Sequence, residues 1–96
     1  MQYFYRSHST PESVLGFATE YFTGRGLHGS SSGDTASYAD ARGSVSVIVE
    51  IEGGHYTRVT VGTKDVGESE IDRVAKRFLS ELHGKEDHSH AVRGAY

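Results

Sequence analysis

The chain has 96 residues, 24% of them charged, with a formal net charge of −3 and no cysteine. This length suits one domain with a single two-layer core, and the acidic balance argues against a dedicated nucleic-acid-binding protein, which usually presents a basic face. The lack of cysteine excludes disulfides, thiolate metal sites and cysteine nucleophiles, and in a domain this small it favours the cytoplasm. No apolar run is long enough to cross a membrane and no signal peptide is recognisable, so we expect no membrane contact.

The first predicted elements are an aromatic strand over residues 3–7 and an amphipathic helix. Ser9 to Glu12 has the spacing of a capping box and includes a proline that suits the first helical turn. Apolar residues then recur at helical spacing, and Gly24 and Gly26 end the helix. Residues 27–34, LHGSSSGD, are rich in glycine and serine and predict a mobile loop.

Three strands follow in the prediction. Residues 35–41 indicate a weak strand, because Tyr38 is its only large side chain. Two strong strands come next, over about 44–52 and 56–63. Gly53 and Gly54 separate them and are typical of a hairpin.

The hairpin register decides which side chains face water. A two-residue loop would pair Val49 with Arg58 and bring a charge to the buried face, whereas a three-residue loop pairs Val49 with Val59. The second register collects the valines on one face, so the pattern favours it. The predicted buried face carries Val45, Val47, Val49, Ile51, Val59 and Val61; the predicted outer face carries Ile48, Glu50, Glu52, Tyr56, Arg58 and Thr60. The side that Tyr3 and Tyr5 occupy stays open, and both join the outer face if Phe4 points inward.

A second helix opens at residues 68–70, with Ser69 as its cap and Phe78 in the middle of its apolar stripe. Gly84 is expected to end this helix. Residues 86–96 are polar and aperiodic, so they predict a flexible C-terminal tail after a single α+β domain over residues 1–85. The expected order is β-α-β-β-β-α, with two helices packed on one face of an antiparallel sheet.

No group of residues predicts catalysis, a cofactor or a metal site. His88 and His90, beside Asp87, resemble a chelating fragment, but this spacing in a flexible tail fixes no geometry. The GRGLHG stretch (24–29) follows a helix, whereas a dinucleotide-binding fingerprint follows a strand and opens a helix. We therefore predict no catalytic, cofactor-binding or metal-binding residues and expect that the protein is not an enzyme.

From residue 10 to residue 83, the order of helix, three strands and helix resembles the outline of a double-stranded RNA-binding domain. That family opens its second helix with lysines that bind phosphates. This chain has the acidic GESEID (67–72) at that place, which would repel RNA. The same order also looks like TBP-like modules and half of a helix-grip fold, shapes that serve many functions.

The sequence favours a non-enzymatic binding or assembly module. Two helices leave one sheet face uncovered, and that face mixes aliphatic, aromatic and arginine side chains, which are typical of protein interfaces. The expected partner is a protein, most simply a second copy in a homodimer. The alternative is a small-molecule-binding domain, with a pocket between the sheet and the first helix under the 27–34 loop.

Overall fold

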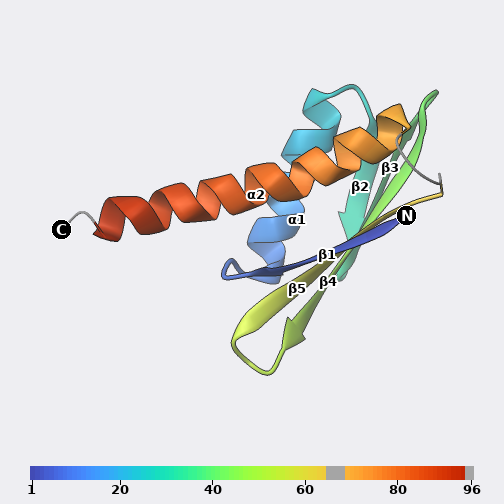
Figure 1. Ribbon diagram of the computed structural model, residues 1–96. Coiled ribbons are helices and arrows are strands. Elements are labelled where there is room, and N and C mark those ends of the chain that lie inside the picture. Colours follow the sequence, from blue (N-terminus) through green and yellow to red (C-terminus); the bar gives the residue numbers. More distant parts are fainter. Residues whose placement is uncertain (65–68, 95–96) are drawn as a thin grey trace.

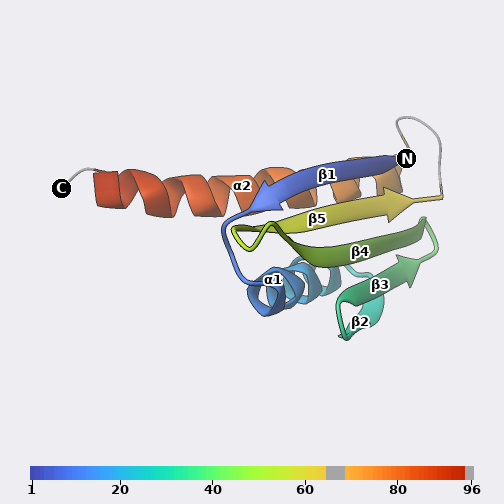
Figure 2. The ribbon, with the colours of Figure 1, turned by 90° about the horizontal axis from the view of Figure 1, so that it is seen from below.

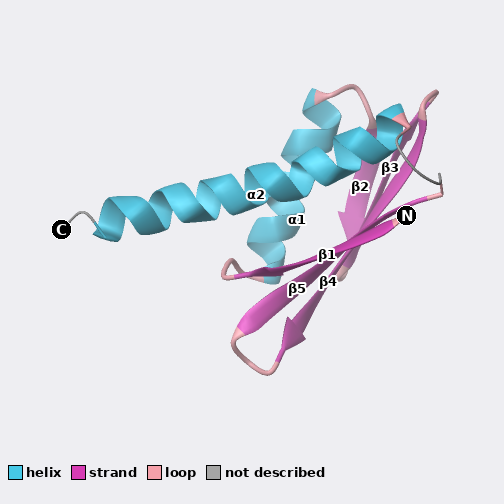
Figure 3. Cartoon of the chain, viewed as in Figure 1, coloured by secondary structure: helices cyan, strands magenta, loops and turns pink. Residues whose placement is uncertain are grey.

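The computed structural model describes residues 1–64 and 69–94, and the surroundings of side chains as far as residue 86. Its elements are β1 (Gln2–Ser7), α1 (Pro11–Gly24), β2 (His28–Ser32), β3 (Thr35–Asp40), β4 (Gly43–Glu52), β5 (Tyr56–Thr63) and α2 (Glu70–Gly94). The strands form one antiparallel sheet in the order β1-β5-β4-β3-β2, and both helices cover the same face of it (Figures 1 and 3). The predicted α+β architecture is confirmed.

Strand β2 lies where the sequence predicted a mobile loop, and that prediction is wrong. β2 pairs antiparallel with β3, from the His28–Ala39 pair to the Ser32–Thr35 pair, and forms one edge of the sheet (Figure 2). Glycine and serine have low strand propensity, and every side chain of β2 is exposed. The strand is therefore held by its backbone hydrogen bonds to β3 and not by buried side chains, which is why composition did not reveal it.

The core fills the space between the helices and the sheet. Phe78 is fully buried, as predicted, and its ring centroid lies 5.2 Å from that of Phe22 and 5.5 Å from that of Tyr21. All five valines of the predicted buried face are buried as well. Ile51 points to the same side but is 69% exposed, because it lies near the β4–β5 hairpin, which projects past both helices (Figure 1). Its predicted place in the core is wrong.

Helix α2 begins as predicted and ends later than predicted. The Ser69 hydroxyl accepts a hydrogen bond from the Asp72 backbone N–H (3.2 Å) and so caps the helix. The helix passes through Gly84 and continues to Gly94, so Gly84 does not end it; a glycine inside a helix costs only about 1 kcal/mol relative to alanine. The predicted domain boundary at residue 85 therefore falls within a helix, and the flexibility of the residues beyond it remains a prediction. In the described part of the chain, neither helix is both long and apolar enough to cross a membrane.

Candidate interaction surface on the open sheet face

The β4–β5 hairpin has the predicted register. Val49 pairs with Val59 and Glu50 with Arg58. The backbone N–H of His55 donates to the carbonyl of Glu52 (3.3 Å), which closes the three-residue loop. Gly53 and Gly54 have φ angles of 63° and 74°, a left-handed conformation that glycine adopts without strain. Consequently, the six residues predicted for the outer face do share one side of the sheet.

Strand β1 adds two residues that the sequence did not assign to this face. Phe4 pairs with Thr60, and Arg6 pairs with Arg58, so both side chains point away from the helices. Tyr3 instead faces α2, where its hydroxyl donates to Asp72 Oδ2 (2.7 Å). This orientation of β1 gives the Tyr3 hydroxyl a partner and leaves the Phe4 ring and the Arg6 side chain exposed. We call the following set the outer face: Phe4, Arg6, Ile48, Glu50, Glu52, Tyr56, Arg58 and Thr60.

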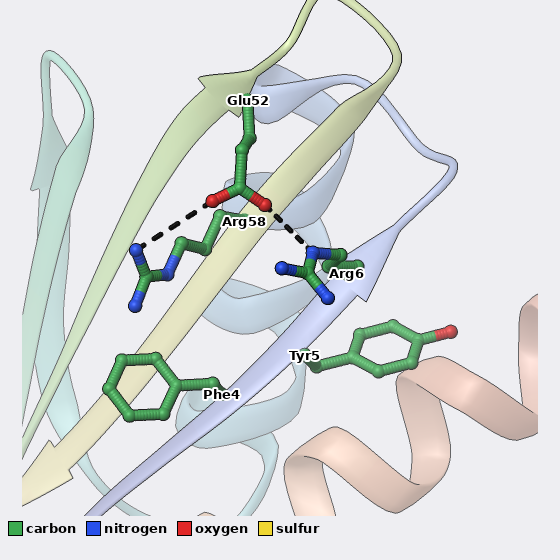
Figure 4. A pocket seen from close by; sticks show the side chains of 5 residues that line it. All are labelled: Phe4, Tyr5, Arg6, Glu52 and Arg58. Carbon is green, nitrogen blue, oxygen red and sulfur yellow. Dashed lines mark hydrogen bonds and ion pairs between the residues drawn. The ribbon is translucent and has the colours of Figure 1, made fainter.

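Glu52 lies between two arginines at the hairpin end of the outer face (Figure 4). Its Oε1 accepts a hydrogen bond from Arg6 Nε (2.8 Å), and its Oε2 lies 3.7 Å from Arg58 Nη1. Arg58 also lies over the Phe4 ring, with its guanidinium carbon 4.7 Å from the ring centroid. Although Glu50 is directly opposite Arg58 in the ladder, it forms no ion pair with any residue that the structure describes. Arg58 is paired with Glu52 instead.

The charges of this cluster reinforce one another. The hydrogen bond from Arg6 holds the pKa of Glu52 below its ordinary value, and the positive charges of Arg6 and Arg58 act in the same direction. The same hydrogen bond raises the pKa of Arg6. Because these groups are open to solvent, their ion pairs add little to stability. Their significance is the fixed pattern of charge that they present.

A shallow hollow of about 230 Å³ opens beside this cluster. Its lining consists of Phe4, Tyr5, Arg6, Glu52 and Arg58, and Figure 4 shows the two guanidinium groups and the Phe4 ring bordering it. Arg6 is on β1 and Arg58 is on β5, and both share the carboxylate of Glu52. The positive charge of the outer face therefore lies toward β1 and β5. The negative charge lies toward β4, which carries Glu50 and Glu52. This arrangement can bind charged side chains through ion pairs and apolar side chains through contact with the Phe4 ring.

The outer face also exposes large apolar groups. Phe4 is 56% exposed, Tyr56 41% and Ile48 36%. The His8 ring lies 5.7 Å from the Tyr56 ring, measured between centroids, and extends the aromatic part of the surface. Aromatic and arginine side chains in this combination are typical of surfaces that bind proteins.

The histidines do not form a metal site in the described part of the chain. No three His, Asp or Glu side chains that the structure describes come together in a way that could hold a metal ion. His88, His90 and Asp87 lie outside the residues whose side chains are described. His83 is instead part of a hydrogen-bonded group, with its Nδ1 3.3 Å from the Tyr5 hydroxyl oxygen.

The pocket expected between the sheet and the first helix finds no support. The loop that would have roofed it is strand β2. The residues that α1 turns toward the sheet, among them Val14, Ala18 and Phe22, are fully buried. Phe22 stacks on Tyr38 of β3 with 4.9 Å between ring centroids, so side chains fill this space.

A second polar cluster, which the sequence did not reveal, joins α2 to the end of β1 and to the loop between β1 and α1. The carboxylate of Glu86 accepts hydrogen bonds from the Ser7 hydroxyl (2.5 Å), the Ser9 hydroxyl (2.8 Å), the Tyr5 hydroxyl (2.8 Å) and the His8 backbone N–H (3.3 Å). Burial would raise the pKa of Glu86, but the hydrogen bonds from Ser7, Ser9 and Tyr5 together outweigh it and hold the pKa below its usual value of 4.5. The cluster fixes the end of β1 against α2.

We expect Glu86→Gln to lower the free energy of unfolding by about 1 kcal/mol at pH 7, since the amide cannot accept all of these hydrogen bonds. Because the pKa of Glu86 is lower in the folded state than in the unfolded chain, ionised Glu86 stabilises the fold at neutral pH, and this stabilisation is lost as the pH falls through the folded-state pKa. The difference between wild type and variant, measured by urea unfolding from pH 7 to pH 3, should therefore shrink below about pH 4.5. Glu20→Gln, the same change at an exposed position of α1, is the control. If the stability difference between wild type and Glu86→Gln does not depend on pH, ionised Glu86 does not have this stabilising role.

The chain matches no model of a known protein family, and no curated protein matches it significantly. Its function is therefore inferred from the outer face itself.

Proposed function

We propose that the chain is a non-enzymatic assembly module that binds a second copy of itself through the outer face. The observation that carries this proposal is the distribution of charge on that face. Arginines lie on β1 and β5 and glutamates on β4, next to exposed Phe4, Ile48 and Tyr56. Such a face is complementary to itself, which is the requirement for an isologous dimer.

A twofold axis parallel to the strands and between β4 and β5 brings the complementary halves together. It stacks β5 of one copy on β4 of the other while keeping each residue at its level along the strands. Since Arg58 and Glu50 are directly opposite in the ladder, each Arg58 then meets the partner's Glu50, which has no ion pair within the described part of its own chain. Ile48 and Thr60 are opposite in the same way and meet across the same axis.

The spacing of stacked sheets suits these side chains. Packed sheets lie about 10 Å apart, a distance that an arginine and a glutamate reaching toward each other can span. Around the axis, the apolar atoms of Ile48, Tyr56 and Phe4 leave water on association, which supplies the favourable free energy. The ion pairs contribute orientation and specificity more than affinity.

A charge-exchange experiment tests the proposal. Arg58→Glu places two carboxylates against each other at every contact of the dimer, and Glu50→Arg places two guanidinium groups there. Each variant alone should self-associate at least about tenfold more weakly than wild type in sedimentation experiments over a range of concentrations. An equimolar mixture of the two variants should associate again, because the exchanged charges restore both Arg–Glu contacts in the mixed dimer.

The control is Arg73→Glu, the same charge change on the exposed side of α2. It should leave self-association unchanged, and all three variants should keep the thermal midpoint of wild type within a few degrees, because none of these residues is in the core. A wild-type chain that stays monomeric at high concentration would overturn the proposal. A wild-type dimer that neither single variant weakens would show that self-association uses another surface.

A further inference from the structure

We infer that the free edge of β1 is a strand-addition site for an extended peptide that carries an acidic side chain. β1 is the last strand of the sheet on its side, so one row of its backbone groups has no strand beside it in the described part of the chain (Figure 2). This edge adjoins the outer face, which includes Phe4 and Arg6 of β1, but the inference does not depend on self-association.

The ladder between β1 and β5 determines which backbone groups face outward. The Met1 amino group donates to the Thr63 carbonyl (3.0 Å), and the Thr63 N–H donates to the Met1 carbonyl (2.9 Å). In an antiparallel ladder such mutually bonded pairs alternate with pairs that do not bond each other. The odd-numbered residues of β1 therefore bond to β5, and the N–H and C=O groups of Gln2, Phe4 and Arg6 point to the free edge.

This edge lacks most of the usual protection against strand pairing, and its one charged residue, Arg6, is ion-paired with Glu52. Natural edge strands are commonly blocked by proline, lysine, a bulge or very short length. β1 has the sequence QYFYRS, with neither proline nor lysine, and its pairing with β5 is uninterrupted from Gln2 to Ser7. It offers six residues of regular strand, with the exposed Phe4 ring beside the open backbone groups.

The side chains beside the edge select the partner's chemistry. A residue added opposite Arg6 places its side chain on the outer face, about 5 Å away from Arg6 between Cβ atoms. Arg6 and Arg58 share the single carboxylate of Glu52, and neither holds it through two parallel hydrogen bonds. A second carboxylate can therefore take the bidentate geometry that arginine favours. An apolar side chain two residues away meets the Phe4 ring.

The helix side of the edge sets a further requirement. The hydroxyls of Tyr3 and Tyr5 reach Asp72 and Glu86, which shows that α2 lies above β1. The partner's alternate residues, which point toward α2, must therefore be short. A second β1 is a poorer partner than such a peptide, because β1 contains no acidic residue to offer to Arg6. The opposite edge, β2, presents only histidine, glycine and serine and has no comparable selectivity.

The test uses the full chain and a blocked heptapeptide, acetyl-Thr-Glu-Thr-Val-Thr-Gln-Thr-amide, which places Glu, Val and Gln opposite Arg6, Phe4 and Gln2 in antiparallel pairing. In NMR titrations we expect the amide signals of these three β1 residues to shift and their hydrogen exchange to slow. A peptide with Lys in place of Glu should bind about tenfold more weakly to wild type, and Arg6→Glu should reverse this order. N-methylation of the peptide's central Val, whose amide would pair with Phe4, should weaken binding by about tenfold without changing the protein.

Phe4→Pro removes the outward N–H from the protein side, where an edge strand tolerates proline. It should weaken binding by a similar factor, and the N-methylated peptide gives the same information if this variant does not fold. The inference is overturned if the parent peptide causes no shifts at millimolar concentration, or if the N-methylated peptide binds as well as the parent. It is equally overturned if the shifts fall on β4 and not on β1, or if only a second copy of the chain protects the edge.

Discussion

Phe78→Ala should lower the free energy of unfolding by about 3–5 kcal/mol, a large part of the stability of a domain this size. Phe78 is fully buried, and its ring contacts three aromatic rings of α1, those of Phe17, Tyr21 and Phe22, at centroid distances of 5.2 to 5.8 Å. Removing it therefore loses the main contact between α1 and α2 as well as buried apolar area. The helices are close-packed there, so a cavity remains.

Urea unfolding followed by circular dichroism measures this effect. Phe78→Leu is the matched variant, because leucine fills much of the volume; we expect a loss of about 1 kcal/mol, which gives a readable transition even if Phe78→Ala is largely unfolded. If Phe78→Ala costs less than about 1 kcal/mol, the helices do not pack around this ring as described.

The sequence predicts the β4–β5 register because a slip of one residue would move every valine to the wrong face. The same argument assigned Ile51 to the core, since alternation reports the side of a sheet and not how far the helices extend over it. At 69% exposure, Ile51 shows the difference. The alternation of side chains along a strand is a local property that the sequence shows. Whether a helix covers a given residue depends on where that helix begins and ends.

The remaining parts of the site depend on contacts between distant segments. Alternation alone allowed either orientation of β1, and the choice rests on Tyr3 and Tyr5, which find Asp72 and Glu86 on α2. The sequence placed Glu86 in a polar tail because its partners lie in β1 and in the loop after it, far away in sequence. Phe4 and Arg6 were consequently absent from the predicted face. Composition cannot supply such pairings.

The second large loss of stability is expected for Gly29→Ala, in strand β2, where the sequence predicted a loop. Gly29 pairs with Tyr38, and a Cβ atom added to this backbone would lie 1.9 Å from the Ser37 carbonyl oxygen and 2.7 Å from the Tyr38 Cα. Both are backbone atoms, so no side-chain rotation can relieve the overlap. β2 must move away from β3, which we expect to cost about 1–3 kcal/mol.

The glycine in HGSSS thus permits a close approach between strands, although in the sequence it indicates a loop. If β2 detaches in Gly29→Ala, the β3 amides that face it should exchange with solvent faster, while those of β4 and β5 keep their protection. Ser31→Ala, two residues along the same exposed strand, is the control and should change stability by less than about 0.5 kcal/mol. Hydrogen exchange and urea unfolding on these two variants separate a close-packed edge strand from a loop. If Gly29→Ala behaves like Ser31→Ala in both measurements, residues 28–32 do not pair closely with β3, and the loop predicted from their composition describes them better.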